Sequence, residues 1–452
     1  MDKQEVVRQA IEAGVQLVFF LYCDNGGIIR GKSTHISSLA SRLHTGIGLT
    51  VAMQAMSDMD MLQAVEGMGP VGEIRLVPDP QTFTILPYAP KRAVMLAAMV
   101  TLEHQPWDAC PRSFLQRMVR QAAEIGLSIK AAFEPEWTLA TRDKDGAFVP
   151  CDKSLCFSSV GMTTSLQVID DIVAALGAQG LQVEQYYPEL GHGQQELSIQ
   201  FAHALRAADS QILYRETVRN IAWRHGLYAS FAPKPFADQA GNGCHIHFSA
   251  WDVTGMHNLF FAAQDRFHLG PTAYHFMAGV LEHLPALVAL TCPSVNSYRR
   301  LKPNAWSSAF VCYGPDNREA AIRIPSLFWG NEMASTNLEL KPSDASANPY
   351  IALGGLIAAG LDGIERRLQP PEDWMLQVDP AALSPQQRSS KGIRRLPSNL
   401  GEAIKALESD AVLLAALGPL LAHSYLAVRR GDLTFFADKD DHFELEHHFY
   451  KY

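Results

Sequence analysis

The stretch AAFEPEWTL at residues 131–139 carries two glutamates that alternate with large apolar side chains. Successive side chains of an extended chain point to opposite faces, so Glu134 and Glu136 share one face while Phe133 and Trp137 share the other. The apolar face predicts packing beneath helices. The acidic face predicts a strand that lines a polar cavity, because burying carboxylates in an apolar core is costly.

Three more segments place polar residues at every second position: QELSIQF (195–201), CHIHFS (244–249) and TNLELKP (336–342). A single segment of this kind is often the solvent-exposed edge of an antiparallel sheet. Four of them in one chain favour a sheet whose apolar face is covered and whose polar face forms a site.

The polar face of this sheet is rich in oxygen donors. Its candidate metal ligands are five carboxylates and one imidazole: Glu134, Glu136, Glu189, Glu196, Glu339 and His245. Carboxylates gathered in a cavity require a cation, and an oxygen-rich donor set suits Mg²⁺ or Mn²⁺ better than Zn²⁺. Five carboxylates fit two ions better than one ion.

Length and patterning predict an α+β protein with two domains. The chain has 452 residues, of which 47% are hydrophobic, and single cores stop growing at about 300 residues. Residues 1–105 start with a helical segment and continue with short strands and turns, which predicts a small β-rich domain. In residues 106–452 helices alternate with strands, which predicts a second and larger domain.

Composition also narrows the partners and the compartment. The net charge of −9 argues against nucleic acid, and no continuous apolar segment reaches the ~20 residues that cross a bilayer, so no membrane is expected. The seven cysteines form no CxxC pair, which favours reduced thiols and a cytoplasmic location. We expect the His447-His448 pair to be solvated.

Six ordered segments make the chain resemble the glutamine synthetase family. They are FEPEW (133–137), PELGHGQQE (188–196), PKPF with GNGCHIHFS (233–249), NSYRRLKP (296–303), GPDNREAAIRIPS (314–326) and LELKPSDASANPYIALGGLIAAGLDGI (338–364). The earlier DNGGIIRGK resembles part of the family's N-terminal domain. The resemblance implies a small β-grasp domain followed by a large catalytic domain with a curved antiparallel sheet lining the active site.

The resemblance implies a ligase that uses ATP as a co-substrate. In the family, the γ-carboxylate of glutamate takes the γ-phosphate of ATP, and an amine then displaces phosphate from γ-glutamyl phosphate. By resemblance, one Mg²⁺ or Mn²⁺ ion is held by Glu136, Glu189 and Glu196. A second ion, which bridges the ATP phosphates, is held by Glu134, His245 and Glu339.

Further site residues follow from the same motifs. Arg318 and Arg323 match the arginines that grip the transferred phosphoryl group, and guanidinium suits bidentate phosphate contacts. Arg300 and Gly241 match residues that bind the amino-acid substrate. The resemblance implies nucleotide contacts for Glu184, His247, Ser249, Arg323 and Asn337, the last of which replaces a family arginine.

Two departures from the family concern the amine. Ammonia-using members carry an acid and a serine in a segment like FDGSS, whereas residues 48–53 read GLTVAM, and Trp306 replaces a glutamate of the flap after NSYRRL. Ammonium must lose a proton before it attacks, so its site needs anions and a base. We therefore expect a neutral, bulkier amine such as an arylamine, for example aniline, in a pocket lined by Thr50, Met53 and Trp306.

A third departure concerns the acid. Lys341 replaces an arginine that helps to hold the substrate carboxylate, so glutamate is the expected acid but other acids stay open. Alkylamines and polyamines are alternative substrates, and a catalytically silent scaffold or a guanidino-type phosphotransferase is an alternative function. The resemblance also implies a homo-oligomer, a dodecamer of two hexameric rings in bacterial members, in which a neighbour's N-terminal domain completes each site.

Overall fold

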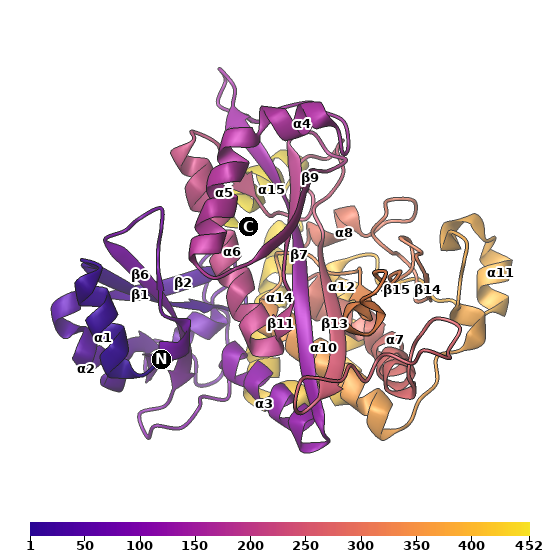
Figure 1. Ribbon diagram of the computed structural model, residues 1–452, viewed down its shortest axis with the longest axis horizontal. Helices are drawn as coiled ribbons and strands as arrows, with labels where there is room; N and C mark the ends of the chain where they lie inside the picture. The colour runs from indigo at the N-terminus through magenta and orange to yellow at the C-terminus, as the bar shows by residue number, and fades with distance from the viewer.

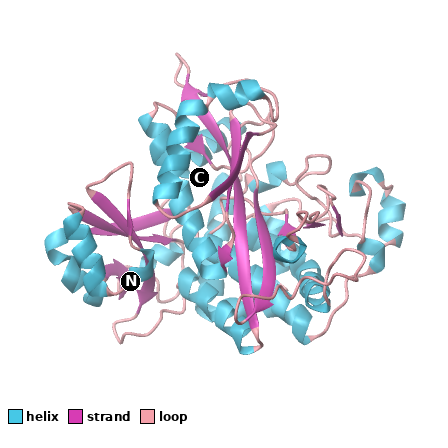
Figure 2. Cartoon of the chain, in the orientation of Figure 1, coloured by secondary structure: helices cyan, strands magenta, loops and turns pink.

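Two β-sheets organise the protein, whose computed structural model describes residues 1–452. The smaller sheet lies in the N-terminal part, drawn in indigo at the left of Figure 1, and the larger sheet runs through the centre of the molecule. Helices and strands are mixed in both parts (Figure 2), so the predicted α+β class is confirmed.

The N-terminal sheet has six strands in the order β2-β1-β6-β4-β3, with β5 paired to β6. The strands are β1 (Leu17–Cys23), β2 (Ile29–His35), β3 (Ile47–Thr50), β4 (Glu73–Pro78), β5 (Thr84–Ile85) and β6 (Arg92–Val100). Strands β1 and β2 form an antiparallel hairpin, and β1 pairs in parallel with β6. Gly27 in the hairpin turn has a φ of +78°, and a side chain there would collide with the carbonyl of Ser346.

Two amphipathic helices cover one face of this sheet: α1 (Lys3–Glu12) and α2 (Ile36–Thr45). Val6 and Ala10 of α1 are buried together with Leu39 and Leu43 of α2. The spacing of these residues is three or four positions, which places them on one helical stripe. Two short 3-10 helices complete this part, η1 (Val51–Ala55) and η2 (Pro80–Thr82).

The larger sheet has ten strands. Seven of them follow the order β14-β15-β16-β13-β7-β10-β9, and the other three, β8, β11 and β12, are short and pair with β7. The bounds are β7 (Leu127–Arg142), β8 (Phe148–Pro150), β9 (Val183–Pro188), β10 (Gln194–Ile199), β11 (Ala202–His203), β12 (Tyr228–Ser230), β13 (Cys244–Asp252), β14 (Tyr313–Pro315), β15 (Ile322–Ile324) and β16 (Leu338–Leu340). All pairs are antiparallel except β14 with β15, which are parallel. The four segments with alternating polar residues therefore lie in one sheet, as predicted.

Helices cover the apolar face of this sheet and form the rest of the large part. They are α3 (Pro111–Glu124), α4 (Ser159–Thr164), α5 (Leu166–Ala178), α6 (Ala204–Arg224), α7 (Pro271–Thr291), α8 (Ser297–Arg300), α9 (Glu332–Ser335), α10 (Pro349–Glu365), α11 (Pro385–Ser390), α12 (Leu400–Glu408), α13 (Ala411–Leu417), α14 (Pro419–Phe436) and α15 (Asp441–Lys451), with the 3-10 helices η3 (Glu372–Trp374) and η4 (Pro380–Ala382). Trp137 of β7 is fully buried and meets Tyr214 of α6 edge to face at 5.8 Å.

Helices α7 and α10 approach each other closely through two glycines. A Cβ atom on Gly279 would lie 2.7 Å from the backbone nitrogen of Gly363, so neither position has room for a larger residue. Helix α7 is long and apolar enough to cross a membrane by composition alone, but 78% of its apolar window is buried inside the protein. This burial is the arrangement of a core helix.

The end of the chain packs against its beginning. Tyr452 is fully buried and its hydroxyl donates a hydrogen bond to the carbonyl of Gly26 at 2.9 Å. His448 is 1% exposed and its Nε2 lies 3.5 Å from a carboxylate oxygen of Asp58. The expectation that this histidine is solvated is therefore wrong, because one face of α15 packs against the protein and buries His448 together with Glu444 and Phe449. All seven cysteines are free.

The predicted domain boundary falls in the connection between the two sheets. Strand β6 ends at Val100 and helix α3 begins at Pro111, so a division at residues 105–106 separates no paired strands. Arg112 spans the two parts, because its guanidinium donates to Asp79 on one side and to Asp209 of α6 on the other, at 2.8 Å each. The boundary itself stays a prediction.

Candidate functional site

The register of the large sheet brings the polar residues of four strands together. His245 lies opposite Glu134 across β13 and β7, and His247 lies opposite Glu339 across β13 and β16. Arg323 of β15 is also opposite Glu339. The period-two pattern of each strand therefore becomes a single continuous polar surface.

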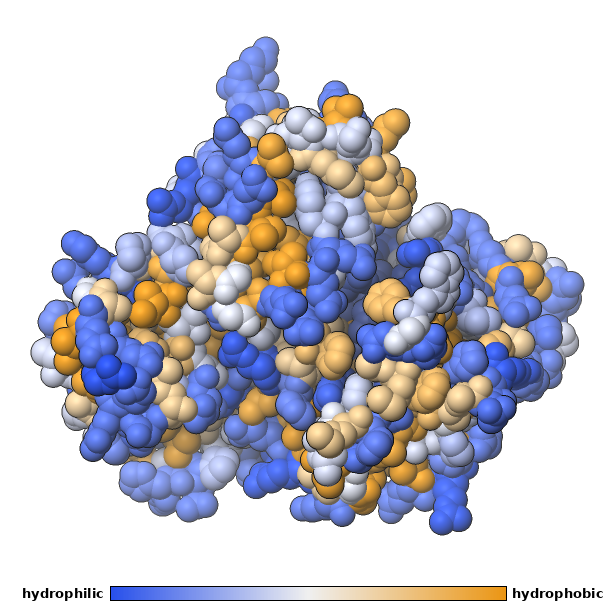
Figure 3. Space-filling view, viewed as in Figure 1, coloured by the Kyte–Doolittle hydropathy of each residue, from blue (hydrophilic) through white to orange (hydrophobic).

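This polar surface lines a cavity of about 1070 Å³. The cavity lies on the face shown in Figure 3, which is hollowed near its centre. It is lined by all the predicted site residues of the large part: Glu134, Glu136, Glu184, Glu189, Glu196, Gly241, His245, His247, Ser249, Arg300, Trp306, Arg318, Arg323, Asn337, Glu339 and Lys341. Thr50 and Met53 do not reach it within one chain. Thr50 is exposed at the end of β3, and Met53 packs on the N-terminal core.

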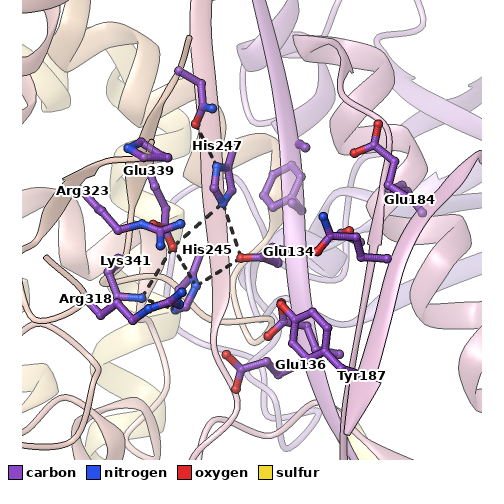
Figure 4. A pocket seen from close by; sticks show the side chains of 18 of the residues that line it. Glu134, Glu136, Glu184, Tyr187, His245, His247, Arg318, Arg323, Glu339 and Lys341 are labelled. Carbon is purple, nitrogen blue, oxygen red and sulfur yellow. Dashed lines mark hydrogen bonds and ion pairs between the residues drawn. The ribbon is translucent and has the colours of Figure 1, made fainter. Parts of the chain in front are cut away.

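A cluster of carboxylates and imidazoles lies at the centre of Figure 4. Single donor atoms of Glu134, His247 and Glu339 all lie within 4.8 Å of one another, which is close enough to hold one metal ion. Nδ1 of His245 also lies 3.1 Å from Glu339 and 3.6 Å from Glu134. Burial raises the pKa of Glu134, but hydrogen bonds from His245 and His247 outweigh it and hold that pKa well below the usual value.

The two histidines present different nitrogens to this cluster. Nδ1 of His247 lies 2.9 Å from the amide oxygen of Asn337, which can only accept, so Nδ1 carries the proton and Nε2 faces Glu134 at 3.4 Å. Nε2 of His245 lies 3.1 Å from a guanidinium nitrogen of Arg300, which can only donate. Nε2 is thus the nitrogen of His247 that faces the carboxylates, so His247 joins the predicted ligands geometrically.

A second group of carboxylates lies on the other side of β7: Glu136, Glu189 and Glu196. None of the three is within ion-pair distance of a lysine, arginine or histidine; the ion pairs of this site all involve Glu134 or Glu339. Burial, together with the charge of Glu136, raises the pKa of Glu189 to about 7. Burial and the charges of Glu134 and Glu136 raise the pKa of Glu196 well above its usual value.

The chemistry of these carboxylates suits a divalent cation, although their oxygens are less closely gathered than the donor atoms of Glu134, His247 and Glu339. Glu136 and Glu196 are 8% and 4% exposed, and like charges this deep in a protein repel each other strongly unless a cation lies between them. Neutral donors hold the group in place, because the Gln194 amide donates to Glu136 at 2.6 Å and the Tyr187 hydroxyl donates to Glu196. Neither supporting residue was predicted from the sequence, although Gln194 lies within the PELGHGQQE motif.

Basic side chains face the histidine cluster. Arg323 forms an ion pair with Glu339, and the ammonium of Lys341 lies 3.5 Å from the same carboxylate. The charge of Lys341, a hydrogen bond from His245 and the charge of His247 keep the pKa of Glu339 well below the usual value in spite of its burial. Arg318 also lines the cavity. The cavity thus has one side that can bind anions and another that can bind cations.

Glycines keep space open beside Arg300. A Cβ atom on Gly241 would lie 3.0 Å from Cβ of Arg300, so a larger residue would displace this buried side chain. A Cβ atom on Gly243 would lie 2.6 Å from the Arg300 guanidinium, 2.8 Å from His245 and 3.0 Å from Glu136. The missing side chain of Gly243 therefore leaves a cradle between a guanidinium, an imidazole and a carboxylate.

Among the predicted nucleotide contacts, Glu184 and Ser249 lie away from this cradle, whereas His247 and Arg323 lie in the histidine cluster beside it. Glu184 of β9 is exposed and is drawn apart from the histidine cluster in Figure 4. The hydroxyl of Ser249 accepts a hydrogen bond from the indole of Trp251 at 2.9 Å. The cavity is thus elongated, with the candidate metal ligands between an anion-binding part and a more open part.

Comparisons with known proteins agree with this geometry. Residues 1–107 match the family described as "Glutamine synthetase N-terminal domain", and residues 108–448 match "Glutamine synthetase, catalytic domain". A gamma-glutamylpolyamine synthetase of Streptomyces coelicolor is 40% identical over 95% of this chain and 92% of its own length. A glutamine synthetase of Thermus thermophilus is 34% identical over 81% of this chain and 83% of its own length.

Solved structures with the same fold cover almost the whole chain. The structure titled "Crystal structure of novel glutamine synthase homolog" has a TM-score of 0.86 at 34% identity and covers 97% of this chain and 99% of its own. The structure titled "GmaS/ADP complex-Conformation 1" has a TM-score of 0.85 at 30% identity and covers 98% of each chain.

Proposed function

The chain belongs to the glutamine synthetase family, whose members are ligases that form carbon–nitrogen bonds with ATP and divalent metal ions, and we propose that it joins glutamate to an amine other than ammonia. The observation that carries this proposal is the cavity itself. Three of its carboxylates, Glu136, Glu189 and Glu196, have no cationic partner. They lie across β7 from the cluster of carboxylates and imidazoles, which has arginines and a lysine next to it.

The proposal assigns two metal positions to these residues. Glu136, Glu189 and Glu196 hold one Mg²⁺ or Mn²⁺ ion, and Glu134, Glu339 and His245 hold the other, with His247 beside them. Bound ions of this kind neutralise the charge of the ATP phosphates and of the phosphoryl group in transfer. Arg323 already lies against Glu339, so it is placed to bind a phosphate oxygen beside the ion, and Arg318 is assigned the same role.

The acid substrate is assigned to the cradle beside Gly243. Arg300 binds the α-carboxylate of glutamate there, Gly241 offers its backbone, and Lys341 adds a second positive charge. A γ-carboxylate oxygen of glutamate attacks the γ-phosphorus of ATP and ADP leaves. The amine nitrogen then attacks the acyl carbon of γ-glutamyl phosphate, phosphate leaves with the oxygen, and the nitrogen gives up a proton.

Trp306 bears on the identity of the amine. Trp306 lines the cavity where a base for ammonium would be needed, which supports a neutral amine such as aniline. A polyamine or alkylamine is the second candidate, and the 40% identity to a gamma-glutamylpolyamine synthetase favours it. We also propose a cytoplasmic homo-oligomer, the predicted dodecamer, in which Thr50 and Met53 of one chain reach the cavity of another.

Phosphate release with ATP, glutamate and a panel of amines tests the function. We expect release with aniline or an alkylamine that clearly exceeds release with ammonium, and a preference for ammonium would contradict the proposed amine class. A silent scaffold would release no phosphate with any amine. It would also show no rise in melting temperature when ATP and Mn²⁺ are added together, whereas an active site gains stability by mass action.

A further inference from the structure

Apolar side chains that were not predicted as site residues form a rim of the cavity. Cys156, Phe157, Met162 and Leu190 line the cavity together, and we call them the apolar rim. Phe157 and Leu190 are 59% and 60% exposed, and Met162 is 37% exposed. Large apolar side chains gathered at the edge of a ligand cavity mark a surface that binds an apolar group.

Phe157 is held in this exposed position at a conformational cost. Its φ is +57°, a left-handed conformation that bulky residues rarely adopt. Its backbone N–H donates to the carbonyl of Pro188 at 2.9 Å, and its ring meets Tyr187 edge to face at 5.0 Å. Strain of this kind persists where the surrounding structure enforces it, and it gathers at ligand sites.

A second aromatic residue at the cavity has the same property. Trp306 has a φ of +54°, is 63% exposed and lines the cavity. Its backbone N–H donates to the carboxylate of Glu319 at 2.6 Å. Two strained and exposed aromatic side chains therefore border one cavity from separate segments of the chain.

The apolar rim adjoins the acidic side of the site. The N–H of Leu190 donates to Oε2 of Glu189 at 2.9 Å, and Sγ of Cys156 lies 4.0 Å from the same oxygen. An organic group bound on the rim would thus lie next to the carboxylates to which the proposed function assigns a metal ion.

None of the side chains of the apolar rim can form an ion pair with a second positive charge. Residues 154–169, which include three of its members and helix α4, contain no charged side chain, and neither do residues 303–315 around Trp306. The carboxylate next to the rim, Glu189, is one to which the proposed function assigns a metal ion, so an ammonium group at the far end of a diamine would lose water there without gaining a free carboxylate partner. An apolar or aromatic group would lose nothing.

We propose that the apolar rim and Trp306 bind the organic group of the amine, and that this group is apolar and carries no second charge. The inference rests on the proposed γ-glutamyl-amine ligase function and deepens it, because it names the amine class and the residues that select it. A polyamine substrate is the outcome that would overturn it.

A pair of substrates of equal length tests the charge requirement. Butylamine and putrescine differ by the terminal ammonium alone, and we expect kcat/KM for butylamine to exceed that for putrescine by at least about tenfold, with aniline at least equal to butylamine. Equal or better turnover of putrescine would overturn the proposal. Absence of turnover with every amine and with ammonium would instead remove the proposed function itself.

A pair of variants tests the residues. Phe157→Asn keeps a residue that tolerates the left-handed backbone, and we expect it to raise KM for aniline at least about tenfold with KM for ATP and glutamate unchanged. Val160→Asn, also exposed on α4 but outside the cavity, serves as the matched control and should change none of these constants.

Calorimetric titration with γ-glutamylanilide provides a readout that needs no turnover. The product should bind the Phe157→Asn protein at least about tenfold more weakly than the unchanged protein and the Val160→Asn protein. Unchanged binding of the product and unchanged KM for aniline in Phe157→Asn would overturn the proposal. A change of oligomeric mass with both constants unchanged would overturn it as well, because the rim would then be a subunit contact.

Discussion

Glu136 and Glu196 lie directly opposite each other on strands β7 and β10, and neither has a cationic side chain within ion-pair distance. Like charges that face each other across a sheet destabilise it. The pKa of Glu196 is raised well above its usual value by burial and by its acidic neighbours, so ionised Glu196 lowers the stability of the folded protein as pH rises. The fold tolerates this repulsion at a site where a cation would relieve it.

Glu196→Gln should therefore stabilise the metal-free protein. Without divalent ions at pH 8, we expect the free energy of unfolding to rise by roughly 1 kcal/mol, because one of two opposed charges is removed. The rise in melting temperature that Mn²⁺ gives the unchanged protein should be largely lost. Glu184→Gln, an exposed acid that lines the same cavity, is the control and should change neither quantity. A lower melting temperature of metal-free Glu196→Gln would contradict this account.

Arg300→Ala should weaken binding of glutamate selectively. Arg300 is 5% exposed and aimed into the cradle beside Gly243, and loss of a charge-assisted hydrogen bond costs about 1.5–3 kcal/mol. We expect KM for glutamate to rise about 10- to 100-fold with KM for ATP nearly unchanged. Steady-state phosphate release at varied glutamate measures this.

The neighbouring arginine supplies the control for that experiment. Arg299 pairs with Glu444 and Asp441 at 2.7 and 2.8 Å and does not line the cavity. Arg299→Ala should leave KM for glutamate within about twofold of its original value. A similar rise in both variants would mean that the effect of Arg300→Ala is structural.

His283 should make stability depend on pH. Its Nδ1 lies 2.7 Å from Asp410 and its Nε2 lies 3.1 Å from Asp362, so one imidazolium connects α7 to α10 and to the start of α13. Burial lowers the pKa of His283, but the two carboxylates outweigh it and raise the pKa above the usual value. This stabilisation is fully present below about pH 6.5, the ordinary histidine pKa, and is lost as pH rises through the raised value.

His283→Gln should accordingly destabilise the protein more at pH 6 than at pH 8.5. We expect a loss of about 1–3 kcal/mol at the lower pH, because two partly buried carboxylates lose a charged partner. Thermal melts at both pH values measure the difference. His225→Gln removes a more exposed histidine that also pairs with a carboxylate, Asp171, and should show little effect at either pH. An equal loss at both pH values would contradict the imidazolium bridge.

Tyr452 and Tyr450 are two residues apart and should differ in their effect on stability. Tyr452 is fully buried and bonded to Gly26, whereas Tyr450 is 62% exposed. We expect Tyr452→Ala to cost about 3–5 kcal/mol and Tyr450→Ala to cost about 0.5 kcal/mol. Denaturant unfolding of both variants checks this, and similar costs would show that α15 does not hold the two parts together.

Much of the fold could be predicted because local patterns determined it. The helical segment at the start of the chain and the strands with polar residues at every second position form where the sequence predicted them. The chemistry of the large sheet followed from AAFEPEWTL, because alternation is a local property and strand pairing then brought like faces together.

Other features depend on distant contacts that no local pattern carries. The burial of His448 depends on contact with Asp58, a residue far away in sequence. The apolar rim has no charge and no regular spacing, so Phe157 and Leu190 resemble ordinary loop residues until the cavity is seen. The different nitrogens that His245 and His247 present to Glu134 and Glu339 follow from Arg300 and Asn337, which only folding brings near.

The hydrogen bond from Tyr452 to Gly26 joins residues separated by 426 positions. Residue 26 emerges from the ribosome long before residue 452 is added. The hairpin that contains Gly26 therefore lacks Tyr452 as a neighbour until that point. The N-terminal sheet can form from its own strand pairs. Its contact with Tyr452 forms only after α15 has been synthesised. Growing chains of this protein therefore leave the Gly26 side of that contact uncovered until Tyr452 has been added.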